Sequence, residues 1–213
     1  RPKRDEKELA QIAAKRAGIR NLENIGFTVR EKPVKAKISC CSKIIRQIYE
    51  FDDGNKVPAI TFMPKGKING AVIVVDDRSD RAIHWNRVVE NLKKGNAIMV
   101  ADLAGVGETG ALKYRFYGNK SPDEGISLLY YMLGKSIVGV RAEEMTVLAD
   151  FLKKRTGQKV EAIPHGRPCI SAAHAFAVRR DLFSKVVALI PPKSWTQSIR
   201  DSKRVPFANV VNG

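Results

Sequence analysis

Residues 70–102 read GAVIVVDDRSDRAIHWNRVVENLKKGNAIMVAD, and this stretch decides the fold class. Its first part, 70–77, is an apolar run with the length of a buried strand, which we expect near the centre of a sheet. Residues 81–94 carry apolar side chains near helical spacing and end before Gly95, a residue type that commonly terminates helices. The run 96–102 is a second buried strand. A strand, a helix and a strand in this order predict a parallel βαβ unit.

The same alternation continues toward the C-terminus. After an irregular Gly- and Tyr-rich stretch to about residue 134, the spacing predicts a long amphipathic helix over about 136–155. A strand at 159–163, a helix built on ISAAHAFAVR and a strand at 184–190 follow. Parallel strands need long crossovers, so these elements predict a mostly parallel sheet with helices on both faces.

Toward the N-terminus the pattern is antiparallel. Residues 45–63 alternate apolar and polar side chains around Asp53-Gly54-Asn55, which predicts a β-hairpin. Residues 3–17 indicate a short amphipathic helix. We therefore divide the chain into a helical and irregular lead-in segment, 1–44, and one α/β domain, 45–213, a three-layer sandwich in which the hairpin leads into the parallel sheet.

The composition is that of one ordinary globular domain, with 213 residues, 44% hydrophobic and 28% charged. We expect no membrane partner, since no run reaches the roughly 18 to 20 apolar residues of a span. The 38 Lys and Arg against 22 Asp and Glu give a net charge of +16. These charges are scattered without aromatic platforms or a groove-reading motif, so nucleic acid is not the expected partner.

The spacing of the cysteines and histidines fits neither a disulfide framework nor a zinc site. Cys40, Cys41 and Cys169 cannot all pair with one another, and no Cys/His spacing fits a zinc site. His84 and His174 fall within predicted helices and are interpreted as packing residues. We therefore expect neither a disulfide framework nor a metal or other cofactor.

One loop carries a family resemblance. The stretch AIMVADLAGVGETG resembles the loop after the fourth strand of α/β hydrolases, with Asp102, Gly105, Gly107 and Thr109 at Asp-x-x-Gly-x-Gly-x-Ser/Thr. The stretch from GKSIVGV to IPHG and the terminal LIPPKSWTQSIRDSKRVPFANVVNG are similar to acetyl xylan esterases. The resemblance covers about residues 45–213. It implies an α/β-hydrolase fold, carboxylic ester hydrolysis and acetylated polysaccharide as partner. It also implies secreted or periplasmic localisation, although the printed chain begins at Arg1 and shows no signal peptide.

The nucleophile elbow departs from the family pattern. In these enzymes a Gly-x-Ser-x-Gly turn exposes the catalytic serine. Here the resemblance places Pro164 and Pro168 at the two glycines and Gly166 at the serine. An acyl-enzyme needs a side-chain oxygen or sulfur, which glycine lacks. The weak substitutes are Cys169 and His165, while Ser171 lies further round the helix. We interpret Cys169 as a small buried cysteine in the first turn of a core helix, although a helix N-terminus would lower its pKa, and His165 as a packing residue.

The family's catalytic acid and base follow the elbow, after two further strands, and have no counterparts in the printed sequence. A sheet ending in VVALI exposes an apolar edge, so we expect missing strands, or a companion domain or chain, to complete it. We expect a catalytically degenerate domain with a structural or binding role within a larger carbohydrate esterase. The alternative is an active carboxylesterase on acetylated carbohydrate with a displaced nucleophile.

Two further interpretations stay open. Gly105, Gly107 and Gly110 match Gly-x-Gly-x-x-Gly after an apolar strand, which is typical of a dinucleotide-binding oxidoreductase, but no helical period follows the third glycine. The pair Asp76-Asp77 follows the first central strand. Two acids near the C-terminal end of a strand face the usual ligand crevice, so a carboxylate or metal site is one interpretation. We interpret the pair as solvated or helix-capping. Anions there would oppose a developing oxyanion, which also indicates lost esterase chemistry.

Overall fold

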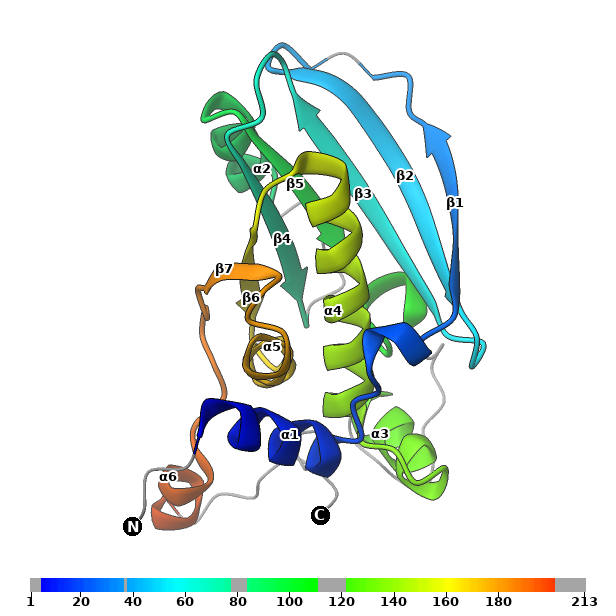
Figure 1. Cartoon of the computed structure of the whole chain (residues 1–213), viewed down its shortest axis with the longest axis vertical. Helices are drawn as coiled ribbons and strands as arrows, with labels where there is room; N and C mark the ends of the chain where they lie inside the picture. Colours follow the sequence, from blue (N-terminus) through cyan, green and yellow to red (C-terminus); the bar gives the residue numbers. More distant parts are fainter. Residues whose placement is uncertain (1–4, 37, 78–83, 111–121, 202–213) are drawn as a thin grey trace.

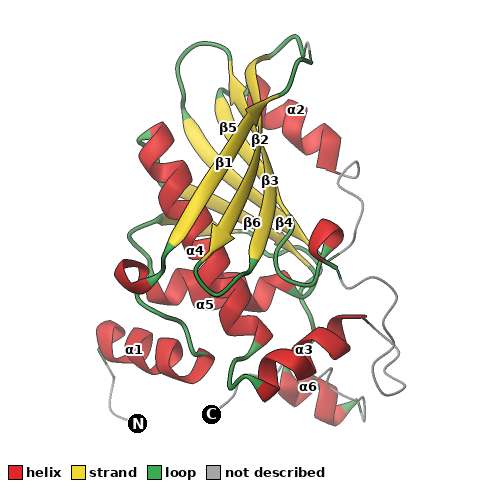
Figure 2. Cartoon of the chain, turned by 90° about the vertical axis from the view of Figure 1, so that its right-hand side faces the viewer, coloured by secondary structure: helices red, strands yellow, loops and turns green. Residues whose placement is uncertain are grey.

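Seven strands form one sheet in the order β1-β2-β3-β5-β4-β6-β7. The computed structural model describes residues 5–36, 38–77, 84–110 and 122–201. The first three strands and the β3–β5 pair are antiparallel, whereas β5, β4, β6 and β7 run parallel (Figures 1 and 2). The strands are β1 (Phe27–Pro33), β2 (Cys41–Phe51), β3 (Lys56–Pro64), β4 (Gly70–Asp76), β5 (Asn96–Ala101), β6 (Val160–His165) and β7 (Phe183–Val186).

Helices cover both faces of this sheet. In Figure 1, α4 and α5 lie in front of the strands and α2 lies behind them. The described helices are α1 (Glu6–Ala17), α2 (Trp85–Lys93), α3 (Pro122–Met132), α4 (Ile137–Thr156), α5 (Pro168–Val178) and α6 (Trp195–Arg200), with 3-10 turns η1 (Leu22–Asn24) and η3 (Gly107–Thr109). The predicted class, a three-layer α/β sandwich with an antiparallel hairpin before a mostly parallel sheet, is confirmed.

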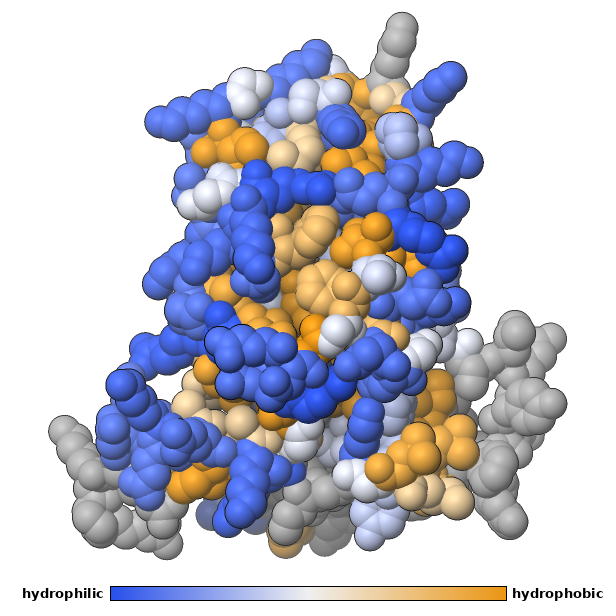
Figure 3. Space-filling view, turned by 45° about the vertical axis from the view of Figure 1, so that its right-hand side comes forward, coloured by the Kyte–Doolittle hydropathy of each residue, from blue (hydrophilic) through white to orange (hydrophobic). Residues whose placement is uncertain are grey.

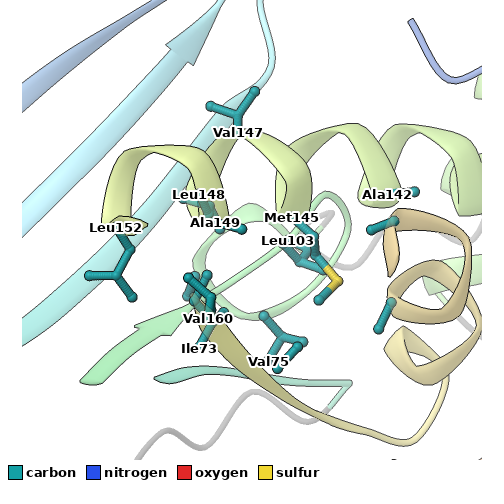
Figure 4. Close-up of a cluster of buried hydrophobic side chains, with 14 of the residues drawn as sticks. Ile73, Val75, Leu103, Ala142, Met145, Val147, Leu148, Ala149, Leu152 and Val160 are labelled. Carbon is teal, nitrogen blue, oxygen red and sulfur yellow. The ribbon is translucent and has the colours of Figure 1, made fainter. Parts of the chain in front are cut away.

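The two layers of core differ in size. The larger cluster lies between the sheet and α4, α5 and α1, and the smaller one between the sheet and α2. Figure 4 shows Leu148 and Leu152 of α4 pointing toward Ile73 of β4 and Val160 of β6. All four side chains are fully buried, and burying such a side chain stabilises a fold by about 1.5–3 kcal/mol. This packing holds α4 against β4 and the start of β6.

The predicted hairpin is confirmed as β2 and β3, which pair from Glu50↔Lys56 onward. The segment interpreted as a helical and irregular lead-in, however, contains a strand that the sequence analysis missed. β1 pairs with β2 from Phe27↔Phe51 to Pro33↔Ile45. Most of its side chains are exposed and several are charged, so an edge strand of this kind lacks the apolar alternation that would identify it.

Two other expectations need correction. The stretch interpreted as irregular to about residue 134 contains α3, in which Pro122 occupies the first helical position, where its missing N–H costs nothing; residues 111–121 lie outside the described part. The last predicted strand, 184–190, is shorter than expected. β7 ends at Val186, and Leu189 makes only an isolated bridge to His165.

No helix in the described residues has both the length and the apolar character needed to cross a membrane.

Candidate active site at the nucleophile elbow

A two-residue turn joins β6 to α5. β6 ends at His165 and α5 begins at Pro168. Between them Gly166 has φ +69°, a left-handed conformation that glycine adopts without the steric penalty of a Cβ. The structure therefore places Gly166 at the tip of a sharp strand-to-helix turn, where the resemblance had put the nucleophile. Pro168 does not prevent this turn, because a proline is well suited to the first position of a helix.

The Asp77 carboxylate fills the space beside Gly166. A Cβ added to Gly166 would overlap the carboxylate carbon and both of its oxygens. The backbone N–H of Arg167 donates to Asp77 Oδ2 at 3.2 Å, and the Arg167 side chain approaches the same oxygen at 3.4 Å. In α/β hydrolases the N–H of the residue after the nucleophile helps to stabilise the oxyanion. Here an internal anion already accepts that hydrogen bond.

The sheet register explains why these residues meet. β4 and β6 are parallel neighbours, and Asp76 is the direct partner of His165. The next residues along the two strands are Asp77 and Gly166, so the same register brings them together. Sequence spacing alone could not reveal this, because 89 positions separate Asp77 from Gly166.

The interpretation of Asp76 as a solvated or capping residue is wrong. Its side chain is buried, with Oδ2 2.9 Å from His84 Nε2 and Oδ1 3.4 Å from His165 Nδ1. A buried carboxylate requires such partners, since an unpaired charge is strongly disfavoured away from water. Asp76 thus fixes the orientation of two imidazole rings behind the elbow. His84 is buried, in agreement with its interpretation as a packing residue.

A metal-ligating set also occurs here. One ligand atom each from Asp76, Asp77 and His165 lies within 4.8 Å of the others. Two carboxylates and an imidazole are ligand types for divalent transition metals. From the sequence we considered a metal only at Cys/His spacings and at the Asp76-Asp77 pair and expected none, whereas strand pairing adds His165 to that pair. Each acid already contacts a protein cation or ring, Asp76 through the histidines and Asp77 through Arg167.

The weak substitute nucleophile Cys169 lies in the first turn of α5 and is buried. Its Sγ donates to the carbonyl oxygens of Pro164 at 3.3 Å and Leu189 at 3.5 Å. The burial of Cys169 agrees with its interpretation as a core cysteine, and burial raises the pKa of the thiol instead of the lowering that a helix N-terminus would give. The thiol therefore lies within the packing between α5 and β6 and is not activated.

The remaining candidates occupy different surroundings. His165 lies at the end of β6 with its ring against Asp76 and is half-buried. Ser171 is buried within α5. His174 lies on the same helix, where burial lowers the pKa of its ring. The structure thus gathers Gly166, His165 and, unpredicted, Asp76 and Asp77 at one point.

The glycine-rich loop after β5 does not form a phosphate cradle. The backbone N–H of Glu108 donates to Asp102 Oδ2 at 2.9 Å, and a Cβ added to Gly107 would overlap the same carboxylate. Gly110 has φ −62° and ψ 137°, an extended conformation, and residues 111–121, where the helix of the fingerprint would lie, are outside the described part. A dinucleotide fingerprint needs a helix there and free N–H groups. The loop geometry therefore does not match the dinucleotide-binding interpretation.

Comparison with known proteins identifies structural neighbours only. No family model matches the chain, and no curated protein matches its sequence. Acetyl xylan esterase 1 from Thermoanaerobacterium sp. JW/SL YS485 superimposes with a TM-score of 0.67 and 16% identity, over 96% of this chain and 64% of the esterase. Acetyl xylan esterase from Paenibacillus sp. R4 gives a TM-score of 0.66 and 11% identity, over 97% and 66%.

A cold-adapted esterase from an Arctic intertidal metagenomic library gives a TM-score of 0.53 and 13% identity, over 76% of this chain and 64% of the esterase. The chain spans less than two thirds of the length of each of these three enzymes. It has the α/β-hydrolase fold of these esterases, as the sequence resemblance implied.

Proposed function

We propose that this chain is a catalytically degenerate acetyl xylan esterase-like domain with a structural or binding role within a larger carbohydrate esterase. The observation that carries the proposal is the Asp77 carboxylate, which occupies the space of a nucleophile side chain beside Gly166. Serine ester hydrolysis needs an oxygen at that point and uncommitted N–H donors for the developing oxyanion.

The electrostatics of the elbow support the same conclusion. A tetrahedral intermediate places a negative oxygen where preorganised donors can stabilise it, and removing one such donor costs about 10²–10³ in kcat. At this elbow the Arg167 N–H is bonded to Asp77, and the carboxylate would repel a second anion. The Arg167 N–H is therefore bonded to the Asp77 carboxylate and is not free to stabilise the oxyanion of a tetrahedral intermediate.

The geometry does not favour the rival proposal, an esterase with a displaced nucleophile. The nearest thiol, Cys169, is buried and hydrogen-bonded to two backbone carbonyls, and burial raises its pKa. A nucleophile of this kind would have to break its packing before reaching a substrate.

Hydrolysis of p-nitrophenyl acetate tests the proposal. We expect no saturable turnover by the parent chain, by Cys169→Ala or by the double variant Gly166→Ser with Asp77→Ala. His165→Ala controls for slow, non-saturable imidazole hydrolysis. Saturable turnover by the parent that Cys169→Ala abolishes would establish the rival proposal instead.

The proposed companion domain or chain would complete the sheet at β7. Within the described residues this strand pairs on one side only, with β6, and Val187 and Ile190 beyond it are exposed. An exposed strand edge offers unpaired N–H and C=O groups to an added strand. This feature supports a structural role in an assembly.

A further inference from the structure

A separate cavity lies on the same edge of the sheet, over β5 and the β2–β3 turn. Its volume is about 550 Å³, within the range of small-molecule sites. The β2–β3 turn, the loop after β5 and helix α3 form its walls, and its lining includes neither Asp77 nor Gly166. The cavity is therefore distinct from the nucleophile elbow.

The wall contributed by α3 is apolar. Ile126, Leu129 and Leu133 line it, together with Ala104 from the loop after β5. Leu129 and Leu133 are also partly exposed at the rim. An apolar patch is visible at the lower right of Figure 3, in the region where Figures 1 and 2 place α3. Most of the surface a ligand would contact is thus hydrocarbon.

One buried carboxyl group lies in the wall of this cavity. Glu144 of α4 lines the cavity and is 1% exposed. Its Oε2 accepts a hydrogen bond from the backbone N–H of Ala104 at 2.8 Å, whereas Oε1 has no hydrogen-bond partner among the described residues. Buried polar atoms in native proteins are nearly always satisfied, so an unpaired one beside a cavity indicates a missing partner.

Four other polar groups around the cavity bond to one another in pairs. Lys135 Nζ lies 2.9 Å from Asp53 Oδ2, and the Tyr130 hydroxyl donates to Asn55 Oδ1 at 2.6 Å. These contacts join α3 and the segment after it to the β2–β3 turn, so the walls are held together. Lys135 and Asp53 thus neutralise each other. Two other charged residues of the lining, Lys56 and Glu108, form ion pairs with Glu50 at 3.0 Å and Arg46 at 4.0 Å.

We propose that this cavity binds a small uncharged molecule with an apolar or aromatic body and a carbonyl oxygen that accepts a hydrogen bond from the Glu144 carboxyl group. Burial raises the pKa of Glu144 to about 8, so at neutral pH the carboxyl group carries a proton and can donate it. The apolar wall would hold the ligand body, and Oε1 would gain its partner. The proposal is independent of whether the elbow hydrolyses esters.

Ligand-observed NMR with three probes of similar size tests it. Acetanilide is neutral and has a carbonyl acceptor, benzylamine is a cation, and phenylacetate is an anion. We expect saturable binding of acetanilide at pH 6, with little binding of the two ions. The affinity should fall about tenfold between pH 6 and pH 9, because the protonated fraction of a group with a pKa of about 8 falls to about a tenth.

Two variants localise the binding. Leu129→Trp fills the cavity and should abolish acetanilide binding, whereas Met132→Trp, on the exposed face of the same helix, should not. Glu144→Gln keeps a donor and should bind with an affinity independent of pH. No binding of acetanilide, binding unaffected by Leu129→Trp, or benzylamine binding that strengthens as the pH rises would each overturn the proposal. None of these readouts involves ester hydrolysis, so they fail or succeed separately from the degenerate-esterase proposal.

Discussion

Three acidic side chains accept hydrogen bonds from backbone N–H groups of loops at the C-terminal edge of the parallel strands. Asp77 accepts from Arg167, Asp102 from Glu108, and Glu144 from Ala104. In enzymes of this architecture, loops at that edge bind anionic or polar ligand groups through such N–H donors. At each of these three points the protein supplies its own anion or acid. At the elbow this internal anion, Asp77, is the residue-scale basis of the proposal that hydrolysis is lost.

Gly166→Ala should destabilise the protein by about 1–3 kcal/mol, since alanine is strained at φ +69° and its Cβ would overlap Asp77. Asp77→Ala removes the overlapping carboxylate but not the backbone strain. We therefore expect urea unfolding of the two single variants and the double variant to show non-additive losses. The double variant should lose less free energy of unfolding than the two single variants lose together. Additive effects would mean that Asp77 does not occupy the space beside Gly166.

We expect the buried carboxyl group of Glu144 to make the free energy of unfolding depend on pH. Burial raises its pKa from the ordinary 4.5 to about 8 in the folded state, so the unfolded chain loses this proton first as the pH rises. The stabilisation from this group is complete below about pH 4.5 and is lost as the pH rises through about 8, by at most about 1.4 kcal/mol per pH unit.

Urea unfolding of Glu144→Gln and the parent between pH 5 and pH 8 checks this dependence. The variant should become progressively more stable relative to the parent as the pH rises. Glu90→Gln, at an exposed position, should show a constant difference. A constant difference for Glu144→Gln as well would mean that Glu144 is ionised in the folded protein.

At the residue scale the elbow could be predicted from the sequence, but the acidic side chains that lie beside it could not. Gly166 was found because a strand and a helix flank it, and both are strong local signals. The roles of Asp76 and Asp77 depend on β4 and β6 being neighbours in a particular register, which is a tertiary property. The raised pKa of Cys169 likewise reflects burial that no local pattern reports.

Among the elements, α4 connects the core to the N-terminal segment. Its N-cap Ser136 donates from Oγ to the backbone carbonyl of Ala17 at 3.0 Å. Glu143 of the same helix forms an ion pair with Arg20 at 3.1 Å. At Gly139 the helix lies so close to the end of α1 that a Cβ would overlap the Ala17 carbonyl oxygen. The first turns of α4 therefore hold α1 in place.

Gly139→Ala should separate α1 from α4. Without displacement the new methyl group collides with backbone, so we expect a loss of about 2 kcal/mol or more in the free energy of unfolding, together with faster proteolysis near residues 5–20. Gly157→Ala, at the C-cap of α4 with open space around it, should cost only the backbone strain of φ +70° and leave proteolysis unchanged. Equal proteolysis of the two variants would contradict this account.

The elements that sequence patterns predicted best are those with two-sided burial or long periodicity. β4 is buried along nearly its whole length and α4 has 20 residues, so both patterns are strong. β1 and α3 were missed for different reasons. β1 is an exposed edge strand whose charged residues hide the alternation, while α3 lies in the Gly- and Tyr-rich stretch that we interpreted as irregular to about residue 134.

At the scale of the whole molecule, burial is uneven across the sheet. β4 lies between β5 and β6 and is covered by core on both faces, whereas β7 is a four-residue edge strand. Hydrogen exchange of the isolated chain should therefore be slowest in β4 and markedly faster in β7. Equal protection of β4 and β7 would mean that β7 is already covered, and that no companion strand is needed there.

The central claim is that the elbow keeps the shape of an esterase site without its nucleophile. The most direct measurement is intact-mass analysis after incubation with a fluorophosphonate, which labels activated serines. The account predicts no adduct on the purified chain, because Gly166 stands at the tip of the turn and Asp77 fills the space beside it. A stoichiometric adduct, mapped by peptide mass to any serine of this chain, would contradict it.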